Sequence, residues 1–124
     1  MEKASKIIFH TDDDTLYLKL VHDILDPFYF VMMCYSGKHL LEHLECMLAD
    51  LIILDIEMPE MDGWETIKHL KKNDVTKNIP VVFYSGNSSP EEIEKGYSLG
   101  AVDFIKKPCL PNDLLNRVNS LLYA

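Results

Sequence analysis

The chain has 124 residues and a formal net charge of −8, with 48% hydrophobic and 26% charged residues. These fractions are typical of one soluble globular domain that is large enough to bury a core, so we predict a single domain over residues 1–124. The excess of acidic residues argues against direct binding of nucleic acid, because phosphate backbones are bound through basic patches.

Neither a membrane span nor a secretion signal is evident. No apolar run approaches the roughly 18 residues that a membrane span requires, and the first residues, M-E-K-A-S-K, hold no signal-peptide core. The cysteines Cys34, Cys46 and Cys109 are far apart and form no C-x-x-C pair. That spacing favours free thiols in a reducing compartment over a disulfide framework or a zinc site. The sequence therefore predicts a cytoplasmic protein.

Short apolar runs recur along the chain and predict five β-strands. They cover residues 7–11, 28–35, 50–55, 79–84 and 102–105. The central run, L-I-I-L at 51–54, has the length and branching of a strand that is buried on both faces. It ends on Asp55, and Pro59 then prevents the chain from continuing as strand or helix.

Between these runs, apolar residues recur at offsets of three and four, which is the spacing of one helix face. The helices predicted in this way cover residues 15–26, 40–48, 64–70, 90–99 and 111–122. The first helix is expected to present one apolar face: Leu16, Tyr17, Leu20, Val21, Ile24 and Leu25. The face of the second is expected to carry Leu40, Leu41, Leu44, Met47 and Leu48.

Strands that alternate with helices indicate a parallel sheet with right-handed crossovers and helices on both faces. Five such units predict an α/β fold with a doubly wound, five-stranded parallel sheet of the flavodoxin-like type, in strand order 2-1-3-4-5.

Polar side chains gather where these strands end. The first strand leads into Asp12 and Asp13, the third into Asp55, the fourth into Ser85 and the fifth into Lys107. Because the carboxyl ends of parallel strands meet at one edge, three carboxylates are expected in one crevice, where a cation must compensate their charge. An all-oxygen site of this kind suits Mg²⁺, and a lysine and a hydroxyl suit a phosphoryl group on a carboxylate.

Each of these residues has an ordinary structural explanation when it is taken alone. An Asp pair after a strand is usually a helix cap, Ser85 a turn residue and Lys107 a solvated side chain. Their arrival at successive strand ends is what favours a functional site.

Four motifs carry a resemblance to a known family. They are T-D-D-D at 11–14, L-D-I-E-M-P-E-M-D-G at 54–63, F-Y-S-G at 83–86 and D-F-I-K-K-P at 103–108. The chain resembles, over essentially its whole length, the receiver domain of bacterial two-component response regulators. That resemblance implies a phosphoprotein that controls a downstream protein partner or an output domain and receives its phosphoryl group from a sensor histidine kinase or a histidine phosphotransfer protein.

The resemblance also implies residue roles. Asp55 would be the phosphoacceptor, and Asp12, Asp13 and Asp55 itself would hold Mg²⁺ together with the backbone carbonyl of Glu57. Lys107, directly before Pro108, matches the family's invariant lysine.

Two further residues match the switch of the family. Ser85 matches the hydroxyl residue that contacts the phosphoryl group, and Phe104 matches the aromatic whose rotamer changes on activation. A phosphoryl group on Asp55 would draw Ser85 toward it, and Phe104 would turn into the vacated space and remodel the surface of the fourth helix, fifth strand and fifth helix.

Some positions depart from the family pattern. His10 and Thr11 stand where aliphatic residues are usual, which leaves Asp13 and Asp14 as an alternative to Asp12 and Asp13 for the acid pair. We choose the earlier pair because it places Leu16, Tyr17, Leu20 and Val21 on the buried face of the first helix. His10 is expected to be a packed or hydrogen-bonded strand residue, and Cys109 a small buried one.

Glu57 and Asn87 lie two residues after Asp55 and Ser85, so they are predicted to flank the path of hydrolytic water and to tune the lifetime of the phosphoryl group. Two competing functions remain at this stage. One is a metal-dependent phosphotransferase or phosphatase with an acidic cluster, and the other is a binding module that no longer uses phosphate. The shortness of the chain argues against the first, and the retained site residues argue against the second.

Overall fold

Five parallel strands form one sheet in the order β2-β1-β3-β4-β5, in a computed structural model that describes residues 5–123. The predicted α/β fold class and strand order are therefore confirmed, whereas residues 1–4 and 124 of the predicted domain lie outside the described residues. The strands are β1 (Ile7–Thr11), β2 (Phe30–Cys34), β3 (Leu51–Leu54), β4 (Val81–Ser85) and β5 (Asp103–Lys106).

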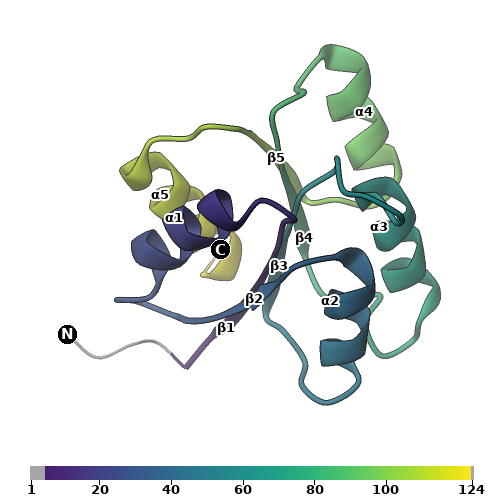
Figure 1. Cartoon of the computed structure of the whole chain (residues 1–124), viewed down its shortest axis with the longest axis horizontal. Helices are drawn as coiled ribbons and strands as arrows, with labels where there is room; N and C mark the ends of the chain where they lie inside the picture. Colours follow the sequence, from purple (N-terminus) through teal and green to yellow (C-terminus); the bar gives the residue numbers. More distant parts are fainter. Residues whose placement is uncertain (1–4, 124) are drawn as a thin grey trace.

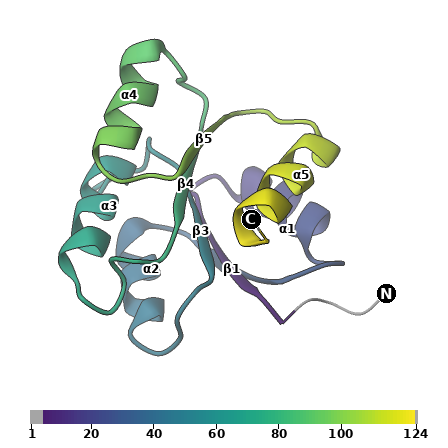
Figure 2. The same ribbon diagram turned by 180° about the vertical axis from the view of Figure 1, so that it is seen from behind.

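Helices cover both faces of the sheet, α1 and α5 on one side and α2, α3 and α4 on the other (Figures 1 and 2). They are α1 (Thr15–Leu25), α2 (Gly37–Leu44), α3 (Gly63–Lys72), α4 (Pro90–Ser98) and α5 (Pro111–Leu122). None of the helices in the described part of the chain is long and apolar enough to cross a membrane.

The central strand β3 divides the core into two halves. All four of its side chains are fully buried. Leu51 and Ile53 belong to the cluster under α1 and α5, while Ile52 and Leu54 belong to the cluster under α2, α3 and α4. Successive side chains of a strand point to opposite faces, so an unbroken apolar run supplies both clusters at once.

The predicted buried face of α1 is wrong at two positions. Leu16 and Leu20 are 60% and 46% exposed, while the buried residues of the helix are Leu18, Val21 and Leu25. A helix advances by about 100° per residue, so Leu16 and Leu20 lie almost opposite Leu18. The helix packs on the sheet through Leu18, which turns the two leucines of the predicted face into solvent.

Other elements differ from the prediction mainly at their ends. Helix α2 ends at Leu44, because the amide of Glu45 turns back to the carbonyl of Glu42, and Met47 and Leu48 are exposed at 43% and 50%. Strand β4 runs one residue further than predicted, so Ser85 is its last residue.

Gly63 fixes the loop that carries the end of β3 into α3. Its amide donates to the carbonyl of Ile56 at 2.7 Å, and a Cβ at this position would lie 2.3 Å from the carbonyl oxygen of Asp55 and 2.7 Å from the Cα of Ile56. Only a glycine allows the first turn of α3 to approach the backbone of Asp55 this closely.

We expect Gly63→Ala to lower the free energy of unfolding by about 2–3 kcal/mol, because the new methyl group meets backbone that cannot move aside. Gly86→Ala is the matched control: no atom lies within 4 Å of the methyl position there, so its effect is expected to stay within about 0.5 kcal/mol. Urea denaturation of both variants measures this, and equal effects at the two glycines would contradict the proposed close approach.

Candidate functional site

Asp12 and Asp55 lie side by side at the carboxyl edge of the sheet. Strands β1 and β3 pair in a register that sets Thr11 opposite Leu54, so the residues that follow them are neighbours. The amide of Asp55 donates to the carbonyl of Thr11 at 3.0 Å, and the amide of Asp12 donates to that of Cys34 at 3.1 Å. The two carboxylates are therefore held by the sheet itself, and the residues are 0% and 5% exposed.

A third carboxylate completes a cluster at this edge. Asp12, Asp13 and Asp55 can each place one oxygen within 4.8 Å of the others. Asp14 has a different task, because its side chain caps α1 and accepts a hydrogen bond from the amide of Leu16 at 2.9 Å. The geometry thus favours Asp12 and Asp13 over the alternative pair Asp13 and Asp14.

Lys107 reaches into the cluster from the end of β5. Its Nζ lies 2.6 Å from Oδ2 of Asp12 and 3.3 Å from Oδ1 of Asp55, and its side chain is 9% exposed. Its amide donates to the carbonyl of Ser85 at 2.9 Å, which ties it to β4, and its peptide bond to Pro108 is cis.

Two tyrosines enclose the ammonium group of Lys107. Its Nζ lies 4.2 Å from the ring centre of Tyr17 and 5.7 Å from that of Tyr84, and the two rings meet edge to face. Aromatic faces attract a cation and exclude water from it. The sequence reasoning missed both as site residues. Tyr17 was assigned only to a helix face and Tyr84 only to a strand, and no spacing rule brings either to a lysine that is many residues away.

The electrostatics of the cluster favour a bound cation. Burial raises the pKa of Asp55 to about 7, and the charge of Asp12 adds to the increase, while Lys107 and the amide of Ile56 act against it. Burial lowers the pKa of Lys107, but its contacts with Asp12 and Asp55 outweigh burial, so the net pKa is raised. The single positive charge of Lys107 thus does not balance the negative charges of two buried carboxylates and a third one nearby.

The donor set fits Mg²⁺. Carboxylate oxygens are the ligands that this ion prefers, and it is usually held through one or two of them. Asp13 is exposed beside the two buried carboxylates, so the cluster is open to solvent on one side. Glu57 is exposed on the loop after β3. That its backbone carbonyl also binds the ion remains a prediction.

Ser85 and Asn87 lie at the end of β4. Ser85 is 1% exposed, and its Oγ accepts a hydrogen bond of 3.4 Å from the amide of Asn87. Glu57 and Asn87 are both exposed, and both line a hollow of about 510 Å³ beside the end of β3. The structure therefore brings together the two side chains that were predicted to flank a water path.

Phe104 lies on β5 and belongs to the core cluster under α2, α3 and α4. It is 8% exposed and packs against Phe83 with ring centres 6.0 Å apart, beneath Gly96 of α4. The aromatic is thus inside the protein in this structure, and its change of rotamer stays a prediction.

Two predictions made from the sequence have mixed outcomes. His10 is a fully buried strand residue, as expected, but neither ring nitrogen has a hydrogen-bond partner in the described part of the chain. Burial lowers the pKa of His10 to about 3, with a further contribution from Lys107, so its imidazole is neutral. Cys109 was expected to be buried and is instead partly exposed.

Comparison with known proteins decides the family. Residues 8–119 match the model of the response regulator receiver domain. The chain belongs to this family. Receiver domains bind Mg²⁺ at an acidic cluster and interact with histidine kinases and output domains, and the Asp12, Asp13 and Asp55 cluster fits the phosphoacceptor site of such a domain.

Similar proteins come from several bacteria. The receiver domain is 40% identical to a probable cyclic di-GMP phosphodiesterase of Vibrio cholerae, over 98% of this chain and 28% of that protein. It is 33% identical to the transcriptional regulatory protein CiaR of Streptococcus pneumoniae, over 93% of this chain and 50% of that protein. The chain therefore spans about half or less of the length of these relatives.

Solved structures agree with this family. The chemotaxis protein CheY4 of Vibrio cholerae superposes with a TM-score of 0.90 at 28% identity, over 96% of this receiver domain and 100% of that chain.

The raised pKa of Asp55 makes a prediction about stability. Between its pKa of 3.8 in the unfolded chain and about 7 in the fold, the folded state binds more protons, so Asp55 reduces stability as pH rises. We expect Asp55→Asn in metal-free buffer to raise the free energy of unfolding by about 2 kcal/mol at pH 8, and by much less near pH 4.

Denaturation of both proteins in EDTA at the two pH values measures this difference, and the titration of groups that do not interact with Asp55 cancels in it. Addition of Mg²⁺ at pH 8 should stabilise the original chain more than the variant. A difference that does not change with pH would show that Asp55 is not forced toward its protonated form.

Proposed function

We propose that Asp55 accepts a phosphoryl group from a phosphohistidine, with Asp12 and Asp13 as the magnesium ligands and Lys107 as the cation on the transferred group. The observation that carries this proposal is the close cluster of three carboxylates around the ammonium group of Lys107. The site would catalyse only its own phosphorylation and dephosphorylation, so the domain is a signalling phosphoacceptor and not a turnover enzyme.

The contacts of Asp55 distinguish the roles of its two carboxylate oxygens. Oδ1 accepts from the amide of Ile56 at 2.9 Å and pairs with Lys107. In the described part of the chain both contacts fall on Oδ1, which leaves Oδ2 to attack phosphorus. The new O–P bond forms as the N–P bond of the phosphohistidine breaks, and the imidazole keeps the bonding electrons and takes up a proton from solvent.

Charge stabilisation accounts for the rest of the chemistry. Phosphoryl transfer is accelerated by positioning and by cations on the phosphoryl oxygens. When bound, Mg²⁺ would supply positive charge to those oxygens. Lys107 supplies a second charge from the other side, and the tyrosine rings around it keep its environment dry.

The switch would begin at Ser85 and end at the α4–β5–α5 surface. Ser85 and Lys107 are joined through the backbone, and Phe104 lies three residues before Lys107. Asp103, next to Phe104, connects the three elements of the surface: it accepts from Tyr97 of α4 and pairs with Arg117 of α5. A movement of this part of β5 would therefore change the surface on both sides of it.

The partners and the location follow from the same proposal. The phosphodonor would be a sensor histidine kinase or a histidine phosphotransfer protein in the cytoplasm, and the reader a downstream protein or an output domain. Leu16 and Leu20 of α1 are exposed close to Asp13 and supply an apolar surface on which a donor can dock.

Phosphorylation can be tested with a small donor. We expect Mg²⁺ and phosphoramidate to add the mass of one phosphoryl group to the intact chain, and Asp55→Asn to abolish the adduct. Lys107→Ala should slow its formation by on the order of a hundredfold, because a charge on the phosphoryl oxygens is lost. Lys106→Ala is the matched control, since the neighbouring lysine is exposed and lies outside the site.

Two outcomes would contradict the proposal. One is an adduct that persists in Asp55→Asn, and the other is equal slowing by the two lysine substitutions. Multiple turnover of a phosphate ester without an adduct would indicate a phosphatase instead.

The lifetime of the adduct can be tested at Glu57 and Asn87. We expect the double substitution to alanine to slow dephosphorylation by on the order of tenfold, because both side chains line the hollow through which water reaches the adduct and can orient it there. Glu91→Ala serves as control, since this exposed acid of α4 does not line the hollow. An unchanged rate in the double variant would rule out the role.

A further inference from the structure

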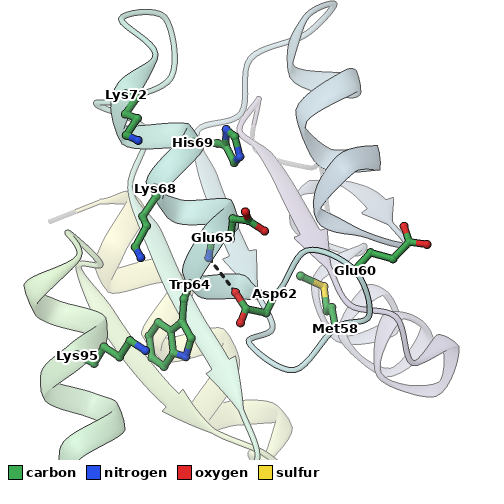
Figure 3. Close-up of a pocket in the computed structure, with 9 residues that line it drawn as sticks. All are labelled: Met58, Glu60, Asp62, Trp64, Glu65, Lys68, His69, Lys72 and Lys95. Atoms are coloured by element: carbon green, nitrogen blue, oxygen red, sulfur yellow. Dashed lines mark hydrogen bonds between the residues drawn. The ribbon is translucent and has the colours of Figure 1, made fainter.

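A groove of about 620 Å³ lies between the outer surfaces of α3 and α4 (Figure 3). It includes Lys95 of α4, and Trp64 lies next to this lysine (Figure 3). The residues that line it are Met58, Glu60, Asp62, Trp64, Glu65, Lys68, His69, Lys72 and Lys95.

The charges in this groove are segregated. Lys68 and Lys72 lie one turn apart on one side of α3, and Lys95 reaches toward the same side from α4 (Figure 3). Glu65 and His69 project from the other side of α3, and Glu60 points away from the lysines (Figure 3). Lysines therefore follow one another along the α4 side of the groove, while Glu60, Asp62 and Glu65 also line it.

These lysines are not neutralised by the protein. Among the described residues, the ion pairs of the chain involve other cations, and Lys68, Lys72 and Lys95 take part in none of them. The nearest acid of the loop, Asp62, is occupied as the N-cap of α3 and accepts from the amide of Glu65 at 2.9 Å. A row of lysines without ion pairs, on a chain of net charge −8, favours a partner that places carboxylates along that row.

Trp64 links this row of lysines to the protein interior. Nζ of Lys95 lies 4.6 Å from its ring centre, and the ring meets Phe83 edge to face at 5.1 Å. Phe83 in turn packs against Phe104 at 6.0 Å. A continuous row of aromatic rings thus runs from the floor of the groove to the residue that the proposed switch moves.

Gly96 makes α4 sensitive to the same rings. It is the only buried residue of α4, and a Cβ there would lie 3.1 Å from Phe104 and 3.2 Å from Phe83. The helix backbone therefore rests directly on the two rings. Because interiors are close-packed, a movement of Phe104 must shift Phe83 or α4, and either shift changes the width of the groove.

We propose that this groove is a docking surface for an acidic segment of a partner protein, and that the position of Phe104 sets its affinity. An extended segment fits better than a small anion, because the lysines are spread along two helices and form no enclosed pocket around one point. A segment with carboxylates along the row of lysines and an apolar side chain over Trp64 complements the groove. The docking proposal is based on the groove alone, whereas its regulation by Phe104 rests on the proposed phosphorylation of Asp55.

The groove also continues toward the phosphorylation site. Met58, Asp62 and Trp64 line both the groove and the hollow that contains Glu57 and Asn87. A segment that occupied the whole groove would cover part of this hollow and restrict access of water to Asp55. Docking is therefore expected to lengthen the lifetime of the phosphoryl group.

The test uses a synthetic peptide of alternating glutamate and leucine residues without tryptophan. Trp64 is the only tryptophan of the chain, so its fluorescence reports occupancy of the groove directly. We expect saturable, salt-sensitive binding that Lys68→Glu combined with Lys72→Glu weakens by on the order of tenfold. Lys38→Glu combined with Lys106→Glu is the matched control, since these exposed lysines lie outside the groove.

Equal loss of binding in the two double variants would overturn the docking surface. So would the absence of saturable binding to the original chain. Sedimentation velocity gives an independent check: a dimer that the groove variant alone dissociates would show that the groove holds a second copy of this chain, which also overturns the proposal.

A second measurement tests the regulation of docking by Phe104 separately from docking itself. After treatment with Mg²⁺ and phosphoramidate, the affinity for the peptide should change by on the order of fivefold in the original chain and not in Phe104→Leu. The mass of each sample shows whether Asp55 carries the phosphoryl group. An adduct without a change in affinity overturns the control by Phe104. The absence of an adduct contradicts the proposed function. In that case the binding of the peptide to the untreated chain still decides whether the groove is a docking surface.

Discussion

The crowding of carboxylates at the carboxyl edge of the sheet is the constraint on which the site depends. Asp12 and Asp55 are almost completely buried, and burying charges costs several kcal/mol for each one unless they are paired. Lys107 pairs with both but supplies only one charge. The residues of the site thus leave part of this negative charge uncompensated, and the raised pKa of Asp55 reflects it. Added positive charge lowers the cost of keeping these carboxylates ionised, which makes the site responsive to a cation.

The sequence was sufficient for the sheet because burial on two faces leaves a clear pattern. An apolar run such as Leu51–Leu54 has few alternatives to a central parallel strand, and the strand order then brings the acidic residues together. The buried face of α1 was less well determined. Leu16 and Leu20 share the helical spacing of truly buried residues, and only packing on the sheet selects Leu18 instead. The spacing of apolar residues identifies a helix more reliably than it identifies which side of that helix faces the core.

The same limit applies within the site. Residues at strand ends could be predicted, because the backbone register alone places them at one edge. Tyr17 and Tyr84 around Lys107 could not, since their contribution depends on the direction of side chains from a helix and a strand that meet only in the fold. His10 shows the converse case: its place in β1 was predictable, but the lack of a partner for its ring within the described structure was not.

Helix α4 lies between two different kinds of contact. On the inner side it presents Gly96 to Phe83 and Phe104, and Ile93 packs partly buried against the same core cluster. On the outer side it is held through the hydrogen bond from Tyr97 to Asp103, at the start of the strand that leads to Lys107. Segments with few buried side chains open at low free-energy cost. Helix α4 has fewer buried residues than any other helix of the described structure, which is why the proposed switch would act on it.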